Sequence, residues 1–395
     1  MNMLLTLALV LLAIPAVLSC GYLLLQTLFA SKPRVPVAST ARAWRFDVIV
    51  PAHNEQGLIE RVVRNLLQLE WPRADFRILV VADNCTDATA ALARAAGAEV
   101  LERSHEQLRG KGYALELAFQ KSRADDRADA VVVVDADSEV SRNLLTACAA
   151  RLDAGAQAVQ VYYGVLDPHS SWRTRLMCIA LSAFHKLRSR ARERFELSCG
   201  LRGNGWCVTH AVLQRVPYGA FSLAEDIEYG IELGLAGERV HYADEAQVAG
   251  EMVSDARSAG TQRQRWEHGR FELIASRTAP LLRAAVRQRS LPCLDLALDL
   301  LVLPLAFVAL NVTLLLIGGA LLLLWNPAAT HWLWLGGGCG LSLALYVLRG
   351  WQLSGMGAAG LMDLARAPFF VAWKVLLMLQ PRESLAWVRT RRKLS

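Results

Sequence analysis

The chain has 395 residues, of which 54% are hydrophobic and only 20% are charged, and its mean hydropathy is +0.27. This composition excludes a disordered protein and is too apolar for an ordinary soluble one. The apolar excess lies at the two ends, while a middle stretch of roughly 220 residues has normal globular composition. We therefore expect one soluble domain between membrane segments.

Basic residues outnumber acidic ones by 43 to 36, so the formal net charge is +7 and the pI is about 9.1. They gather beside the apolar runs and at the C-terminus, as Lys32, Arg34 and Arg392 illustrate. This placement favours an anionic membrane surface and argues against a nucleic-acid partner, which would need a basic stripe with interleaved aromatics. The eight cysteines are scattered without C-x-x-C spacing, which argues against a zinc site or a disulfide framework.

The N-terminal apolar run, Leu4–Ala30, has no positive charge before it and several after it. We expect residues 1–30 to be an uncleaved transmembrane anchor with its N-terminus outside, followed by a basic juxtamembrane linker at 31–45. The alternative is a signal peptide, which would have a basic start, a shorter apolar core and a small-x-small cleavage site. The anchor reading predicts that the following domain faces the cytoplasm.

Further apolar runs follow the central domain. Residues 269–299 are predicted to form an amphipathic interface segment, and residues 300–348 two transmembrane helices, from runs at Leu300–Trp325 and His331–Leu348. Residues 349–395 are interpreted as an interfacial amphipathic segment with a basic tail, because a further crossing would place that tail outside. An Ala- and Arg-rich chain without a targeting segment favours a multi-pass protein of a bacterial inner (plasma) membrane.

Between residues 46 and 268, short apolar runs alternate with helical periodicity. Phe46–Val50, Arg77–Val81 and Ala130–Val134 are predicted strands, and Asn54 is expected to cap the first helix between them. This alternation predicts an α/β domain at 46–268 with a mostly parallel sheet. Ligands of such a sheet lie at the carboxyl ends of its strands.

Polar clusters follow three of these strands: Pro51-Ala52-His53-Asn54-Glu55, Asp83-Asn84-Cys85-Thr86-Asp87 and Asp135-Ala136-Asp137. None contains G-x-G-x-x-G, which disfavours a dinucleotide-binding dehydrogenase. Asp83 can accept a hydrogen bond from a base or ribose, although helix capping explains Thr86 and Asp87 equally well. Asp135 and Asp137 can hold a hard divalent cation that neutralises a diphosphate, or they form an ordinary turn.

Three more clusters lie outside these strand ends: Arg109-Gly110-Lys111-Gly112, Ala224-Glu225-Asp226 and Gln262-Arg263-Gln264-Arg265-Trp266. The first places a cation at a helix start, which suits phosphate but also describes a plain basic turn. The acidic pair enters a predicted helix, and acidic residues in a first helical turn are often only partners of the helix dipole. The last cluster, taken alone, indicates interface anchoring.

The chain resembles the family 2 glycosyltransferases of GT-A fold in five motifs and in their order. These motifs are V-P-A-H-N-E, D-N-C-T-D, D-A-D, A-E-D and Q-R-Q-R-W. The membrane-bound branch with the cellulose, chitin, hyaluronan and poly-N-acetylglucosamine synthases is most similar, over Asp47–Trp266. The resemblance implies a metal-dependent inverting hexosyltransferase that takes a hexose or N-acetylhexosamine from a UDP-sugar. The acceptor would be a growing glycan or a lipid-linked saccharide at the cytoplasmic face, for cell-surface or exopolysaccharide synthesis with export or assembly proteins.

The resemblance also implies roles for single residues. Those expected to line the donor nucleotide and its phosphates are Pro51, His53, Glu55, Asp83, Lys111 and Asp135. Asp137, with Asp135, would ligate Mg²⁺ or Mn²⁺. Asp226 matches the general base, with Glu225 as a supporting residue.

In the last motif, Arg265 would stabilise the departing diphosphate, Trp266 would stack on the acceptor sugar and Gln262 would complete that gate. Displacing UDP from an anomeric carbon needs a cation for the developing charge and a carboxylate for the acceptor proton. One such displacement inverts the centre, so an α-linked donor would give a β-glycoside.

Two motifs depart from the family pattern: Ala224 stands where cellulose synthases have threonine, and Asp83-Asn84-Cys85 where many relatives have Asp-Asp-Gly.

Two other functions compete with the transferase. An inactive membrane scaffold would be free to lose Asp137, Asp226 or Arg265, and all three are intact. A phosphohydrolase with Asp135 as nucleophile would usually carry its D-x-D after the first strand, and here it follows a later one.

Overall fold

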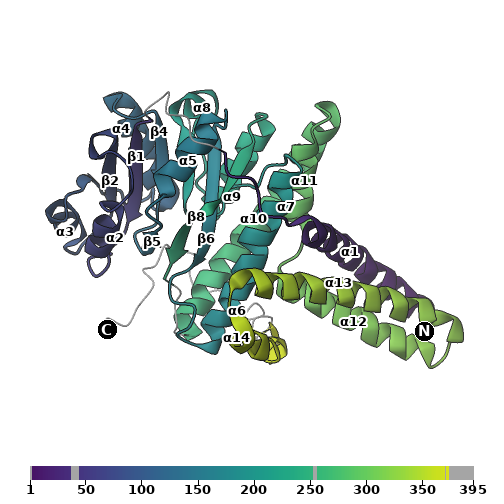
Figure 1. The fold of residues 1–395 in the computed structure, drawn as a ribbon. Helices are drawn as coiled ribbons and strands as arrows, with labels where there is room; N and C mark the ends of the chain where they lie inside the picture. The colour runs from purple at the N-terminus through teal and green to yellow at the C-terminus, as the bar shows by residue number, and fades with distance from the viewer. Residues whose placement is uncertain (1, 37–43, 252–255, 370, 373–395) are drawn as a thin grey trace.

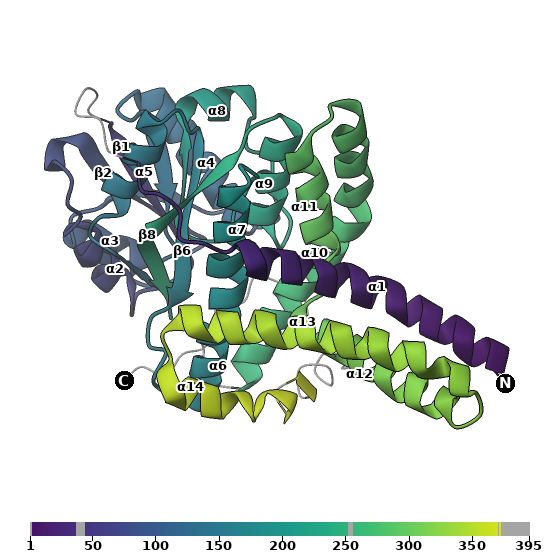
Figure 2. The ribbon, with the colours of Figure 1, turned by 45° about the vertical axis from the view of Figure 1, so that its right-hand side comes forward.

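The computed structural model describes residues 2–36, 44–251, 256–369 and 371–372, and gives only the backbone for residue 2 and residues 256–267 (Figure 1). An α/β domain forms one end of the molecule. Three long helices, α1, α12 and α13, project from it side by side, as Figures 1 and 2 both show. The predicted alternation of strands and helices is therefore confirmed.

In the part of the chain that the structure describes, eight strands form one sheet in the order β3-β2-β1-β4-β7-β6-β8-β5. Their bounds are β1 Phe46–Ala52, β2 Phe76–Asp83, β3 Glu99–Arg103, β4 Ala130–Val133, β5 Ser138–Val140, β6 Ala158–Val165, β7 Trp206–Thr209 and β8 Val240–Gly250. The pairs β3-β2, β2-β1, β1-β4 and β6-β8 are parallel, whereas β7 runs antiparallel to both of its neighbours. The prediction of a mostly parallel sheet is confirmed.

Helices cover both faces of this sheet. Those of the α/β domain are α2 Ile59–Leu66, α3 Thr89–Ala95, α4 Lys111–Asp125, α5 Leu144–Asp153, α6 Trp172–Leu181, α7 Arg188–Arg194, α8 His210–Arg215 and α9 Glu225–Leu235. A π-helical turn, η2, joins α6 to α7 over Ser182–Leu187. Alternate residues of β4 pack on opposite sides, Val132 with α2 and α5 and Val131 with α4, so this strand is buried on both faces.

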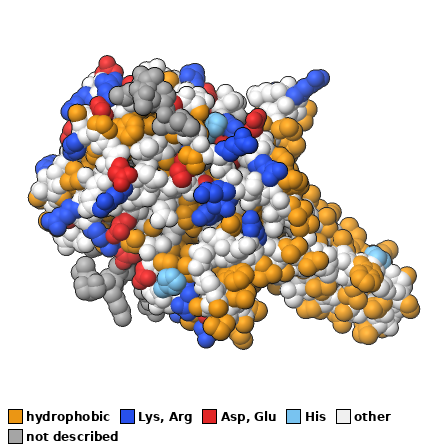
Figure 3. Space-filling view, viewed as in Figure 1, with side chains coloured by type: hydrophobic (Ala, Val, Ile, Leu, Met, Phe, Trp, Pro, Cys, Tyr) orange, Lys and Arg blue, Asp and Glu red, His pale blue; other side chains and the backbone are white. Residues whose placement is uncertain are grey.

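The remaining helices follow the sheet or precede it. They are α1 Asn2–Phe29, α10 Ala256–Arg287, α11 Leu291–Leu301, α12 Leu305–Leu323, α13 Thr330–Ser354 and α14 Gly357–Leu364. Among the described residues, three segments are long and apolar enough to cross a membrane: Met3–Phe29, Leu305–Leu323 and Pro327–Ser354. Hydrophobic side chains cover these projecting helices, whereas charged ones are scattered over the α/β domain (Figure 3). This distribution supports membrane association.

Two local predictions are wrong. Asn54 does not cap the first helix, because α2 begins at Ile59 and the backbone of Asn54 is left-handed, with φ of 56°. The apolar run Leu300–Trp325 is not one helix, since α11 ends at Leu301 and α12 begins after Pro304. Proline lacks the backbone N–H that a helix interior needs, so it stands before the first turn of α12.

Gly112, at the start of α4, has no side chain, and this allows the backbone at Ala220 to pack closely against it. This contact provides a test of the fold. A Cβ there would lie 2.3 Å from the backbone oxygen of Ala220. Gly112→Ala should therefore cost about 1–3 kcal/mol of stability, measured as a lower temperature of thermal unfolding. Gly219→Ala is the control, because a Cβ at Gly219 meets nothing within 4 Å. An unfolding temperature for Gly112→Ala equal to that of the control would contradict this packing.

Candidate functional site

The carboxyl ends of three neighbouring strands bring the polar clusters of the sequence together. β1 lies between β2 and β4 and runs parallel to both. Asp83 is the last residue of β2, His53 follows β1, and Asp135 follows β4 by two residues. Parallel strands end at the same edge of the sheet, so these three clusters share one rim.

Asp83 is the buried polar residue at the β2 end of this rim. Its side chain is fully buried, and Oδ1 accepts hydrogen bonds from Arg103 Nη1 at 2.6 Å and from Asn84 Nδ2 at 3.1 Å. The other oxygen, Oδ2, has no hydrogen-bond partner. His53 lies beside it, with Nδ1 2.8 Å from the carbonyl oxygen of Asp83. A buried acceptor without a partner is costly, and a ligand N–H would relieve that cost.

Hydrogen bonds tie the loop after β1 to the loop after β2. The side chain of Asn54 accepts from the backbone N–H of Thr86 at 2.8 Å, and the backbone N–H of Glu55 donates to Thr89 Oγ1 at 2.8 Å. The N–H of Asn54 also contacts Cys85 Sγ at 3.3 Å. Asn54 therefore holds two loops together, a role that its sequence position before a helix did not indicate.

Lys111 is the residue that joins the other strand ends. Its Nζ lies 2.7 Å from Asp135 Oδ1 and 3.4 Å from Glu225 Oε1, and it donates to the carbonyl oxygen of Gly203 at 2.6 Å. Desolvation lowers the pKa of Lys111, but Asp135 and Glu225 outweigh it and raise that pKa above its ordinary value. The ammonium group therefore stays charged and fixes three loops around one point.

Two carboxyl groups of the site hold protons more tightly than usual. Desolvation, with the charge of Asp137 and against that of Lys111, raises the pKa of Asp135 to about 6. Desolvation and the neighbouring Glu225 raise the pKa of Asp226 to about 7. Asp226 faces Gly203, where an added Cβ would lie 3.6 Å from Asp226 Oδ2. A carboxylate with a pKa near neutrality is suited to proton abstraction.

The sequence analysis missed two residues of the site, Asn204 and Tyr163. Asn204 is fully buried, accepts from the backbone N–H of Asp135 at 3.0 Å and donates to Ser138 Oγ at 2.7 Å. Ser138 Oγ in turn lies 3.2 Å from Asp137 Oδ1, so one amide side chain orders the D-x-D loop. Tyr163 enters from β6, where desolvation and then Asp137 and Asp135 raise the pKa of its hydroxyl.

Gly203-Asn204-Gly205 carried a signal for this role. Both glycines have positive φ, 87° and 68°, and they allow the tight turn that points Asn204 at the carboxylates. As a sequence pattern, Gly203-Asn204-Gly205 is also a G-x-G that lacks the third glycine of a dinucleotide-binding motif. Tyr163 gave no signal, because it stands inside an ordinary strand pattern.

The residues present fit a hexacoordinate cation that is shared with a substrate. No three His, Cys, Asp or Glu side chains gather at metal-ligand distance in the described ranges. Asp135 and Asp137 nevertheless put two carboxylates on one strand-end loop. Mg²⁺ and similar cations commonly take one or two protein carboxylates and complete their shell with phosphate oxygens and water.

The third predicted group lies on α10. The helix contains Gln262, Arg265 and Trp266, but their side chains lie outside the described residues. The backbone of α10 passes beside the acidic segment, because a Cβ on Gly269 would lie 3.1 Å from Ala224 Cβ. The helix is therefore placed next to Glu225 and Asp226.

Comparisons with known proteins agree with this architecture. A family profile described as Glycosyltransferase like family 2 matches residues 44–269. The chain is 23% identical over 234 residues to a probable glycosyltransferase, YdaM, of Bacillus subtilis, covering 57% of this chain and 55% of that protein. It is 25% identical over 236 residues to a beta-monoglucosyldiacylglycerol synthase of Nostoc sp., covering 57% of this chain and 49% of that protein.

The chain thus spans about half the length of the curated relatives that it matches. Among solved structures, a mannosyltransferase of Pyrobaculum calidifontis, PcManGT, in complex with GDP-Man and Mn²⁺, aligns with a TM-score of 0.51 at 21% identity. That alignment covers 86% of this chain and 99% of the other. It confirms the predicted GT-A fold.

The raised pKa of Asp226 has a consequence for stability. The pKa of Asp226 is about 7 in the folded chain and ordinarily 3.8. Between pH 3.8 and pH 7 the folded chain therefore holds a proton on Asp226 that the unfolded chain has lost. The stabilisation is fully present below the ordinary pKa and is lost as the pH rises through about 7. Asp226→Asn should therefore gain unfolding temperature relative to the unmodified protein between pH 5 and pH 8.

The measurement is thermal unfolding of both proteins across this pH range. Glu102→Gln is the matched control, because Glu102 is 61% exposed and pairs with Arg94 on the surface. The control should keep the pH profile of the unmodified protein. If Asp226→Asn gives that same profile, the carboxyl group does not hold the proton assigned to it.

Proposed function

The chain belongs to glycosyltransferase family 2, and we propose that it transfers a hexose or N-acetylhexosamine from a UDP-sugar to a lipid-linked acceptor, with inversion. The observation that carries this proposal is the convergence of Lys111, Asp135, Asp137 and Asp226 at one edge of the sheet. It places a cation, a candidate metal-binding pair and a high-pKa carboxyl group within one rim. These are the groups that displacement of a nucleoside diphosphate requires.

The nucleotide would lie against the β1 and β2 ends. Asp83 would accept an N–H of the base, and its buried Oδ2 without a hydrogen-bond partner supports this role. Pro51, His53 and Glu55 would form the adjoining wall. Lys111 lies where the diphosphate would follow, and its raised pKa keeps it cationic beside that charge.

Asp135 and Asp137 would hold Mg²⁺ or Mn²⁺, which supplies positive charge to the departing diphosphate. Asn204 orders these two carboxylates through the N–H of Asp135 and through Ser138. Their fixed geometry would orient the donor before reaction.

Asp226 would take the proton of the acceptor hydroxyl, and Glu225 would maintain its raised pKa while contacting Lys111. The hydroxyl oxygen bonds to the anomeric carbon as the bond to the diphosphate breaks, so an α-linked donor gives a β-glycoside. Gln262, Arg265 and Trp266 remain proposed acceptor-side residues on α10. The contact of Gly269 on the same helix with Ala224 supports this proposal.

Two observations favour a lipid-linked acceptor over a growing polysaccharide. Three described helices are apolar and long enough to span a membrane. One group of relatives is named for synthesis of a glucosyldiacylglycerol. We further propose a bacterial inner membrane with the GT-A domain at the cytoplasmic face. A polysaccharide product with export or assembly partners would require this acceptor assignment to be abandoned.

The test is release of nucleoside diphosphate by the full chain in nanodiscs. The donors are UDP-glucose, UDP-N-acetylglucosamine, UDP-galactose, UDP-glucuronate and GDP-mannose, each with Mg²⁺, Mn²⁺ or EDTA and a lipid extract. We expect one UDP-sugar to turn over with metal, and Asp226→Asn to lower kcat by at least about 100-fold. Glu102→Gln should keep full activity. Absence of turnover with every donor would instead support an inactive scaffold.

A further inference from the structure

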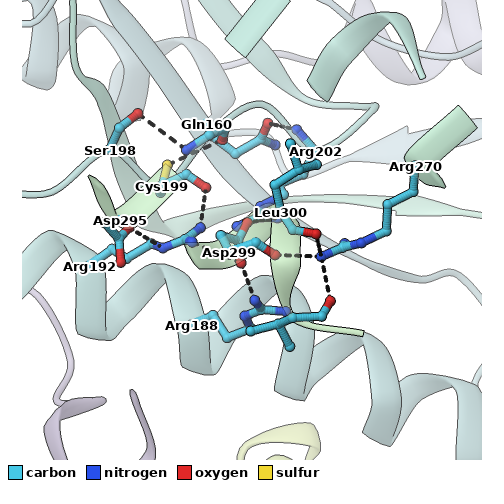
Figure 4. Close-up of polar contacts among 12 residues, drawn as sticks. Gln160, Arg188, Arg192, Ser198, Cys199, Arg202, Arg270, Asp295, Asp299 and Leu300 are labelled. Atoms are coloured by element: carbon cyan, nitrogen blue, oxygen red, sulfur yellow. Dashed lines mark hydrogen bonds and ion pairs between the residues drawn. The ribbon is translucent and has the colours of Figure 1, made fainter. Parts of the chain in front are cut away.

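A second polar cluster lies outside the strand-end site, where the projecting helices meet the domain (Figure 4). Its centre is Asp299 of α11, which pairs with Arg188, with Arg192 at 2.8 Å and with Arg202 at 3.4 Å. Arg192 also lies 2.9 Å from Asp295 Oδ2. We call these three arginines and two aspartates the arginine cluster.

The arginine cluster carries an excess of buried positive charge. All five side chains are buried, and three guanidinium groups face two carboxylates. Arginine does not lose its proton in proteins, so the imbalance cannot be removed by deprotonation. A fourth arginine, Arg270, lies at the edge of the cluster, where its charge also acts on Asp299 and where it donates to the carbonyl oxygens of Asp299 and Val302. An uncompensated buried charge is strongly unfavourable.

Several buried N–H groups of the cluster also lack acceptors. Arg202 Nε and Nη2 and Arg188 Nε have no hydrogen-bond partner. Both guanidinium groups lie against the ring of Phe184, with Cζ 4.6 Å from its centroid for Arg202 and 4.9 Å for Arg188. The neighbouring His185 has an unpartnered Nδ1, and desolvation, Arg202 and Arg188 lower its pKa, so it adds no charge. The free donors therefore gather around one aromatic ring.

The position of the cluster connects it to the proposed acceptor side. The backbone N–H of Arg202 donates to Gln160 at 2.8 Å, and the next residue is Gly203, which contacts Lys111 and faces Asp226. On its other side, Arg192 donates to the hydroxyl of Tyr22 in α1 at 2.7 Å. The cluster thus lies between the loop that contains Gly203 and the apolar helix α1.

We propose that the arginine cluster binds the phosphate group of an anionic membrane lipid, and that a headgroup hydroxyl of this lipid accepts the sugar: its oxygen bonds to the anomeric carbon, its proton passes to Asp226 and the nucleoside diphosphate leaves. Guanidinium groups bind phosphate oxygens through paired N–H donors, and a phosphate would supply the missing negative charge. The assignment of the lipid as acceptor rests on the proposed function. The phosphate site itself rests on the charge excess and the unpartnered donors, and it can be tested without turnover.

The experiment is thermal unfolding of the detergent-solubilised full chain with inorganic phosphate, with dioleoyl phosphatidic acid or with dioleoylglycerol. Phosphatidic acid should raise the unfolding temperature, because a ligand that binds only the folded state stabilises it. Dioleoylglycerol should not. An equal rise with inorganic phosphate alone would overturn the lipid assignment, and no rise with either phosphate probe would overturn the site.

Arg202→Met separates a ligand site from a structural ion pair. Asp299 keeps Arg188 and Arg192 in this variant, so we expect it to unfold at a higher temperature than the unmodified protein without lipid. It should also lose the response to phosphatidic acid. Arg215→Met is the control, since Arg215 is 52% exposed and should leave that response unchanged. Arg202→Gln serves the same purpose if Arg202→Met does not fold.

A lower unfolding temperature with an intact response to phosphatidic acid would show that Arg202 is only structural. Donor turnover is measured on the same preparation. Turnover without a response to phosphatidic acid overturns this inference alone, whereas a response without turnover with any donor overturns the proposed function alone.

Discussion

The interaction on which the site depends is the set of contacts made by Lys111. One ammonium group, at the first residue of α4, joins the end of β4 through Asp135, the start of α9 through Glu225 and the glycine loop through Gly203. Without a cation there, the carboxylates would repel one another in a partly desolvated rim. In this arrangement burial and the neighbouring Glu225 raise the pKa of Asp226, which suits it to accept a proton. Charge balance around Lys111 therefore links the fold to the proposed chemistry.

Much of the architecture could be predicted because its signals are local. The valine run at 131–134 identifies a strand buried on both faces, and Asp135 and Asp137 follow it directly. Parallel strand order then brings Asp83 and His53 to the same edge, since β1 lies between β2 and β4. Five motifs in one order carried the family resemblance, and the matched residues 44–269 agree with it.

What could not be predicted depends on contacts between distant segments. Asn204 orders the D-x-D loop from 69 residues away, as the hydrogen bond to the N–H of Asp135 shows. The contacts of the arginine cluster join residues from α1, α7 and α11. No sequence pattern in these segments indicates that Arg192, Asp295 and Tyr22 lie in contact. Asn54 appeared to be a helix cap because its side chain suits that role, but tertiary bonding to the next loop determines its conformation. The roles of Gln262 and Trp266 stay predictions, because their side chains lie outside the described residues.

The central claim is that the strand-end rim binds a nucleoside diphosphate through a metal held by the D-x-D loop. The most direct measurement is titration calorimetry of UDP into the full chain in nanodiscs, with Mn²⁺ or with EDTA, beside Asp137→Asn. The account predicts binding with Mn²⁺ that is lost in EDTA and weakened at least tenfold in the variant, a change of about 1.4 kcal/mol. Binding that is equally tight in EDTA and in Asp137→Asn, or no binding of UDP under any condition, would contradict it.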